Sequence, residues 1–323
     1  MIEQKRLLWL DTAKALAMIA VVFSHEFSSV EPLVVLCNSF MLPLFFMCSG
    51  FCLSPGKYSM NEYIKRKSRS LLLPYFALGL IVSLLHIGIS GIEEVVLSIE
   101  KELFSWQTLW FLPVLFFADI ILYVFLSKSR KILVMNVSVG LISLILGIVF
   151  CKLGFSIFVN LGVVPIAMFY LSVGYGVKRL FGIQTISSNK LMLGSCILFF
   201  GLVVMVVTKG NLVLKYNDIL PISKLAFSTL EGVGIMYILS SIITPPILQK
   251  FHVNIHLLVY IGKNTMAIFA FHMPVFFYSQ AYIRPIFTNQ FFYKPVEFIL
   301  IWGICLMLIP LFNQYVPVLI GKK

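Results

Sequence analysis

Charged residues are scarce in this sequence of 323 residues. Asp, Glu, Lys and Arg together make up 12% of the chain, about half of their share in soluble globular proteins, while hydrophobic residues make up 60%. Sizeable polar stretches, internal repeats and low-complexity tracts are absent as well. These absences exclude a soluble domain of ordinary size and predict an integral membrane protein with a single domain over residues 1–323.

A metal-binding pattern of cysteine and histidine is also missing. Cys48 and Cys52 lie one helical turn apart in an apolar segment, without a histidine or a second cysteine pair near them. We therefore interpret the cysteines as small core residues and expect no metal cofactor. The neighbouring Ser49 and Gly50 are expected to mark a point where helices pack closely rather than a nucleophile.

Ten apolar segments are long enough to cross a bilayer, which requires about 20 mostly apolar residues. The first is too long for a cleavable signal peptide and lacks its small-residue cleavage site, so we expect it to be retained. We predict an all-α bundle of about ten transmembrane helices. The predicted spans are 9–27, 33–53, 70–89, 107–126, 132–151, 155–177, 191–208, 219–243, 257–279 and 295–318.

Basic residues outnumber acidic ones by 25 to 13, but they alternate from loop to loop instead of forming one patch. If the N-terminus is cytoplasmic, 16 of them fall on the cytoplasmic side and 6 on the other, with Lys14, Lys224 and Lys263 inside spans. This asymmetry follows the positive-inside rule and predicts that both termini are cytoplasmic. Membrane lipids, not nucleic acid, are the expected partners of these charges.

The first predicted span carries three ionisable residues on one face. At about 100° per residue, Lys14 and His25 are offset by about 20° after three turns, and Asp11 and His25 by about 40°. Ionisable groups inside spans are costly and normally face the bundle interior or a watery cavity. The stripe is either an ion pair of Asp11 with Lys14 below an interfacial histidine, or a functional surface that crosses roughly 16 Å of membrane.

Five strings occur in an order and at spacings that resemble the membrane-bound acyltransferase 3 family. The first contains the family's Asp, a basic residue and a His eleven positions after it, with Lys14 where many members have Arg. The third contains the family's Arg-x-x-Arg pattern as Arg66 and Arg69. The strings are LDTAKALAMIAVVFSH (10–25), LPLFFMCSGF (42–51), YIKRKSRSLLLPYF (63–76), LWFLPVLFFADIIL (109–122) and YIGKNTMAIFAFHMPV (260–275).

The resemblance implies transfer of an acyl group, commonly acetyl from acetyl-CoA, to a hydroxyl of a carbohydrate or lipid-linked sugar outside the cytoplasm of a bacterium. It assigns the catalytic role to His25, and a histidine is also the usual base for removing a proton from an attacking hydroxyl. Lys14 and Asp11 complete the predicted catalytic set. Direct base catalysis and an acyl-imidazole intermediate both stay open. Glu26 turns away from His25 and marks either the membrane interface or the acceptor mouth.

The donor's phosphates require cations at the cytoplasmic side. The resemblance assigns this role to Lys65, Arg66 and Arg69, just before the third span, and arginine can hold phosphate with two parallel hydrogen bonds. The alternative is that these residues only set topology and contact anionic lipid head groups. Trp110 is added to the predicted donor site because it lies in the family's Trp-Phe-Leu string.

Three further polar residues inside spans are candidates for substrate binding. Glu231 lies seven residues after Lys224 on nearly the same face, so a buried ion pair is the alternative. His272 lies in the fifth string, and the alternative for it is an ordinary packed histidine. Asp119 follows Trp110 by nine residues, which places the two on opposite helical faces.

A transporter or flippase of a lipid-linked or polymeric sugar is the alternative function. In that case the charged stripe would line a permeation path, and His25 would relay protons. The stripe combined with the Arg-x-x-Arg pattern favours the acyltransferase, since a flippase has no evident need for a CoA site. The expected location is a bacterial inner or plasma membrane.

Overall fold

The computed structural model is helical, with no strand in the parts of the chain that it describes, which are residues 6–27, 32–90, 109–153, 161–181, 188–207, 222–287 and 290–322. The α-helices are α1 (Leu8–Glu26), α2 (Pro32–Cys52), α3 (Met60–Lys67), α4 (Leu73–Ser90), α6 (Phe111–Lys128), α7 (Ile132–Lys152), α8 (Val164–Phe181), α9 (Ser188–Val207), α10 (Ile222–Ile242), α11 (Pro245–Lys250), α12 (His256–Lys263), α13 (Thr265–Tyr282) and α14 (Gln290–Tyr315). Shorter turns are the π-helix η1 (Ser68–Leu72) and the 3-10 helices η3 (Leu161–Val163), η4 (Arg284–Ile286) and η5 (Pro317–Ile320).

Ten helical segments of the described chain are long and apolar enough to cross a membrane, which confirms the predicted all-α membrane bundle. Eight of the ten spans lie close to the ranges expected from hydropathy alone. The side of the membrane on which the termini lie stays a prediction.

The third span begins at Met60 and not at residue 70, so the basic segment expected just before the span is part of the helix. Ser59 caps α3 by accepting a hydrogen bond from the backbone N–H of Glu62. The acid in the first turn and the lysines and arginine in the last turn also match the helix dipole. The π-helix η1 then joins α3 to α4 without interrupting the segment.

The ninth span begins at Thr265, because the helix is interrupted one residue earlier. Asn264 has φ −122° and ψ 20°, outside the α-helical region, and it separates α12 from α13. Lys263 therefore lies exposed at the end of a short helix, and the prediction that it lies inside a span is wrong.

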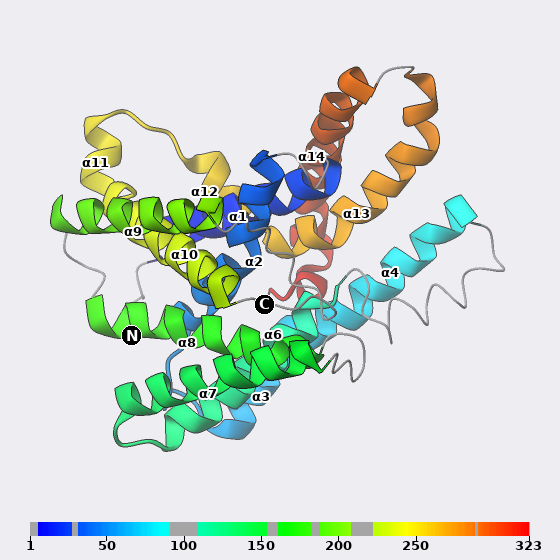
Figure 1. The fold of residues 1–323 in the computed structure, drawn as a ribbon. Coiled ribbons are helices and arrows are strands. Elements are labelled where there is room, and N and C mark those ends of the chain that lie inside the picture. Colours follow the sequence, from blue (N-terminus) through cyan, green and yellow to red (C-terminus); the bar gives the residue numbers. More distant parts are fainter. Residues whose placement is uncertain are drawn as a thin grey trace.

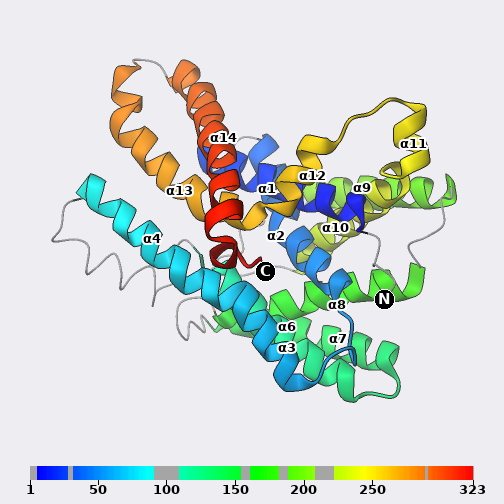
Figure 2. The same cartoon turned by 180° about the vertical axis from the view of Figure 1, so that it is seen from behind.

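The helices α1 and α2 lie in the centre of the molecule in both views (Figures 1 and 2). Small residues on α1, such as Ala13 and Ala17, are fully buried and allow neighbouring helices to approach. At the crossing of α2 and α8, a Cβ on Gly50 would overlap the backbone of Leu171. The prediction that Gly50 is a close-packing point is confirmed.

The bundle has an interior and a rim. In the most apolar stretch of the α8 segment 67% of the residues are buried, against 11% for α9. Figure 1 shows α9 beside α10 on one flank and the hairpin of α13 and α14 on the other. The rim helices expose large apolar side chains such as Phe199 and Met307, as expected for surfaces that face lipid.

Candidate active site

A cavity of about 280 Å³ lies between α1, α2, α6 and the α12–α13 break. Lys14, Met18 and Val21 line it from α1, and their spacing of four and three residues places them on one helical face. Four residues further along the same face is His25. The stripe predicted for the first span therefore runs along the wall of this cavity and continues to the histidine.

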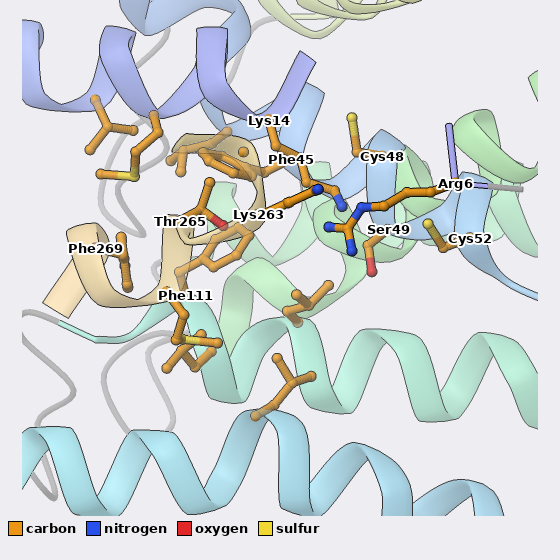
Figure 3. A pocket seen from close by; sticks show the side chains of 18 residues that line it. Arg6, Lys14, Phe45, Cys48, Ser49, Cys52, Phe111, Lys263, Thr265 and Phe269 are labelled. Carbon is orange, nitrogen blue, oxygen red and sulfur yellow. The ribbon is translucent and has the colours of Figure 1, made fainter. Parts of the chain in front are cut away.

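One end of the cavity is cationic. Figure 3 shows the nitrogen ends of Arg6, Lys14 and Lys263 pointing toward one another, and we name these three residues the cavity cations. Arg6 Nε lies 2.6 Å from Oδ2 of Asp11, and Lys14 Nζ lies 3.6 Å from Oδ1 of the same carboxylate. Asp11 is buried, so its negative charge holds two of the three cations in place.

Lys263 reaches the cavity because α12 packs directly on α1. A Cβ on Gly262 would overlap the backbone carbonyl of Asp11, so only glycine permits this approach. The contact sets the next residue, Lys263, beside Lys14 at the cationic end.

The remainder of the cavity is apolar. Phe45, Phe111 and Phe269 line it from three different elements, and the ring centroids of Phe111 and Phe269 are 5.9 Å apart. The ring of Phe269 also lies 6.0 Å from that of His272. Phe269 therefore lines the cavity and also lies beside His272.

Two histidines lie next to each other close to Phe269. The ring centroids of His25 and His272 are 5.4 Å apart, and His25 is exposed whereas His272 is buried. His272 Nδ1 lies 3.0 Å from the carbonyl oxygen of Ile268. Because a carbonyl oxygen only accepts, Nδ1 carries the proton, and Nε2 is an acceptor that has no hydrogen-bond partner among the described residues.

A buried carboxyl group follows His25 directly in the chain, and a second one from α14 lies against it. Glu26 at the end of α1 faces Glu297 on α14, and both side chains are buried. Among the described residues, none of the four carboxyl oxygens has a hydrogen-bond partner. Glu26 is therefore packed inside the bundle and does not mark an exposed membrane interface.

The predicted phosphate-binding residues lie outside this cavity. Lys65, Arg66 and Arg69 are exposed on α3 and η1, and none of them lines the cavity. Arg66 pairs with Glu62 at 3.2 Å, and its guanidinium lies 4.2 Å from the centre of the Tyr58 ring. Trp110 lies at the start of α6, next to the cavity residue Phe111.

Asp119 has partners within the protein. Its Oδ2 lies 2.6 Å from Lys67 Nζ and accepts a 2.7 Å hydrogen bond from the Tyr63 hydroxyl, and the carboxylate is fully buried. The structure thus places this predicted substrate residue in an ion pair with the segment that carries Arg66, away from the cavity.

Glu231 is fully buried and accepts a hydrogen bond from the Ser39 hydroxyl. Its Oε1 has no hydrogen-bond partner among the described residues. None of the four ion pairs in the described part of the chain involves Lys224, so the alternative of a buried pair with that residue is not formed.

Comparison with known proteins adds one finding to this geometry. The family model described as an acyltransferase domain matches residues 7–312, which is nearly the whole chain. The chain belongs to the acyltransferase 3 family. No curated protein and no solved structure matches it.

Membership of the acyltransferase 3 family makes the protein a membrane acyltransferase, as the resemblance of its five strings predicted. The matched range contains both histidines, the carboxyl pair and every cavity-lining residue except Arg6. The family match favours the acyltransferase hypothesis over the transporter hypothesis. Among the described residues, no group of three or more His, Cys, Asp or Glu could hold a metal ion.

Three residues lie at or near the site of the acyltransferase but were not predicted from the sequence to do so. In the sequence, Arg6 is only one of the basic residues on the predicted cytoplasmic side, Lys263 falls within a predicted span, and no pattern gives Glu297 a role. A Gly-Lys-Asn-Thr interruption within an otherwise apolar string was the available signal for Lys263. Nothing local to α14 indicates that Glu297 meets Glu26.

Proposed function

We propose that this protein transfers an acetyl or other short acyl group from cytoplasmic acyl-CoA to a hydroxyl of a carbohydrate or lipid-linked sugar outside the cytoplasm. A cell-surface glycan of a bacterium is the proposed acceptor, and the inner or plasma membrane is the proposed location. Family membership supports the acyl transfer, and the finer assignment rests on the geometry of α1 and its neighbours.

The observation that carries the proposal is the series of residues along one face of α1. Lys14, Met18 and Val21 on this face line the cavity, and His25 lies one turn further along it. Lys14 and His25 are separated by roughly 16 Å along the helix axis. An acyl-CoA has a phosphorylated end and a long, thin arm that carries the acyl group. Its phosphates would match the cavity cations, and its arm would span the distance to His25.

The proposed reaction uses His25 as general base. Its imidazole takes the proton of the acceptor hydroxyl, whose oxygen forms a bond to the acyl carbon of the thioester. The carbon–sulfur bond breaks, and the leaving sulfur takes the proton back from the imidazolium to depart as a thiol. His25 is exposed, so a hydroxyl can reach it from outside the bundle.

The other predicted residues take supporting roles in this proposal. Lys14 contacts the donor in the cavity, and Asp11 is a positioning residue that holds Arg6 and Lys14. His272, with its Nε2 acceptor next to His25, holds the acceptor hydroxyl or the catalytic imidazole by a hydrogen bond. The roles of Lys65, Arg66, Arg69 and Trp110 in donor binding, and of Glu231 and Asp119 toward substrate, stay predictions.

Radiolabelled acetyl-CoA tests the proposal with purified protein in liposomes. His25→Ala is expected to lower acetyl turnover by about 10²- to 10⁴-fold, the usual contribution of a general base, while acetyl-CoA binding is retained. An acid quench during turnover shows whether label is attached to the protein, which separates an acyl-imidazole from direct base catalysis.

His256→Ala is the matched control, because His256 is an exposed histidine on α12 that does not line the cavity. The control variant should turn over acetyl-CoA like the parent. If the parent neither binds nor consumes acetyl-CoA or other acyl-CoA thioesters, the proposed donor is wrong. Equal turnover in His25→Ala and the parent would instead remove His25 from the chemistry.

A further inference from the structure

The cationic end of the cavity contains more positive than negative charge. Within the described chain, Asp11 is the one carboxylate that forms ion pairs with the cavity cations, and it contacts Arg6 and Lys14. Lys263 has no ion pair in this part of the chain. Uncompensated cations around a cavity attract anions from the surrounding water.

A fourth cation comes from the opposite end of the chain. Lys322 lies just after η5, and burial together with the positive charges of Arg6 and Lys263 lowers its pKa below the ordinary value of lysine. Lys322 therefore lies within electrostatic range of Arg6 and Lys263, although it does not line the cavity itself.

Lys322 is held in place by its neighbours. Its Nζ donates hydrogen bonds to the side-chain oxygens of Asn264 and Asn313, and the amide of Asn313 donates a 3.0 Å hydrogen bond to Asn264. These partners are neutral, so they orient the ammonium group without cancelling its charge. Asn264 is the residue that separates α12 from α13, between the cavity residues Lys263 and Thr265.

The C-terminal segment is packed onto the same region. Ile320 is buried, and Gly321 adopts φ +74° where it meets the backbone carbonyl of Ser70 in η1. The next residue of η1, Leu71, lines the cavity. The N-terminus of α13 also faces the cavity through Thr265 and Met266, and its helix dipole adds positive potential there.

We propose that Lys322 and the cavity cations form one binding site for the phosphate groups of the acyl donor, and that the C-terminal segment 317–322 completes it. This inference rests on the proposed function, since it assigns the phosphorylated end of the acyl-CoA to this site. An anionic lipid head group offers the same phosphate chemistry, and the experiment separates the two sources.

Equilibrium binding of acetyl-CoA measures the site directly. The protein is held in nanodiscs of neutral phosphatidylcholine, and parent, Lys263→Gln and Lys322→Gln are compared over a range of salt concentrations. Loss of one charge-assisted contact to phosphate is expected to weaken binding about tenfold in each variant. The dependence of affinity on salt should decrease as well.

Two matched variants serve as controls. Lys128→Gln removes an exposed lysine at the end of α6 that does not line the cavity, and it should bind acetyl-CoA like the parent. Lys322→Arg keeps the positive charge and should retain most of the affinity. If Lys322 mattered only through the shape of its side chain, this variant would lose affinity as well.

Cys52 provides a second measurement that does not depend on turnover. It is exposed and lines the cavity, so its labelling by a maleimide should be slowed by acetyl-CoA in the parent. The same concentration of acetyl-CoA should protect Cys52 less in Lys322→Gln. Cys196 on the rim helix α9 is also exposed and should show no protection.

The outcomes distinguish this inference from the proposed function. If the parent binds acetyl-CoA and both lysine variants bind it equally well, the inference is overturned and the proposed function stands. A second comparison uses nanodiscs that also contain phosphatidylglycerol. If the variants bind less phosphatidylglycerol than the parent but keep their acetyl-CoA affinity, the site belongs to a lipid and the inference is overturned. A parent that binds no acyl-CoA overturns both.

Discussion

The cavity cations and the basic residues of α3 and η1 differ in what surrounds their charges. Arg6, Lys14 and Lys263 converge on a cavity and share one carboxylate. Arg66, in contrast, is exposed, pairs with Glu62 and stacks on Tyr58. Concentrated and weakly neutralised charge binds an anion more strongly than charge that is solvated and already paired. A basic sequence pattern therefore does not by itself locate the stronger site.

Within the basic segment, the largest expected effect is structural. Lys67→Ala should lower the free energy of unfolding by about 3 kcal/mol, because it leaves the buried carboxylate of Asp119 without its cation. Arg66→Ala, which breaks an exposed pair, should cost less than about 1 kcal/mol. Thermal unfolding in detergent measures both, and equal losses would mean that the Lys67–Asp119 pair is not a stabilising element.

Substitution of Lys14 tests whether the cavity cations bind the donor. Lys14→Ala should reduce kcat/KM for acetyl-CoA by about tenfold or more, because a cation that contacts the donor is lost. Lys14→Arg should keep substantial activity, since the charge is retained. Kinetics with acetyl-CoA at constant protein abundance provide the measurement, and full activity in Lys14→Ala would reduce this residue to a partner of Asp11.

The exposed arginines should give a smaller effect. For Arg66→Ala combined with Arg69→Ala, we expect acetyl-CoA affinity to fall by less than about tenfold, because exposed charges are screened by salt and solvent. Binding isotherms at low and physiological salt test this expectation. An unchanged affinity would exclude these arginines from donor binding, whereas a loss larger than that of Lys263→Gln would reverse the comparison.

The smallest expected effect is on pH dependence. The pKa of Lys322 lies below the ordinary 10.5 because burial and the charges of Arg6 and Lys263 disfavour its charged form. As pH rises through this lowered pKa, Lys322 loses its charge and affinity for phosphate should decrease, before an ordinary lysine would titrate. Over the same interval the folded state should become more stable, because the unfolded state binds more protons.

Desulfo-coenzyme A, which has neither thiol nor thioester, is a suitable probe at alkaline pH. Its affinity for the parent should begin to fall at a lower pH than its affinity for Lys322→Arg, whose guanidinium stays charged. Identical pH profiles of the two proteins would show that the charge of Lys322 does not contribute to ligand binding.

The sequence determined those features that depend on neighbouring residues of one helix. Ten spans were predictable because a bilayer requires about 20 apolar residues in each, and the stripe from Lys14 to His25 was predictable because helical periodicity is local. Two span boundaries were not predicted, because α3 is a polar helix and because a single residue, Asn264, interrupts an apolar string.

Only the tertiary structure decided which charges meet. Arg6, Lys263 and Lys322 come from three distant parts of the chain, and no local pattern states that α12 packs on α1 or that η5 packs on η1. The same holds for His272 beside His25 and for Glu297 beside Glu26. Hydrophobicity drives each helix into the membrane, but close packing of small residues and interhelical hydrogen bonds select its neighbours, and those neighbours assemble the site.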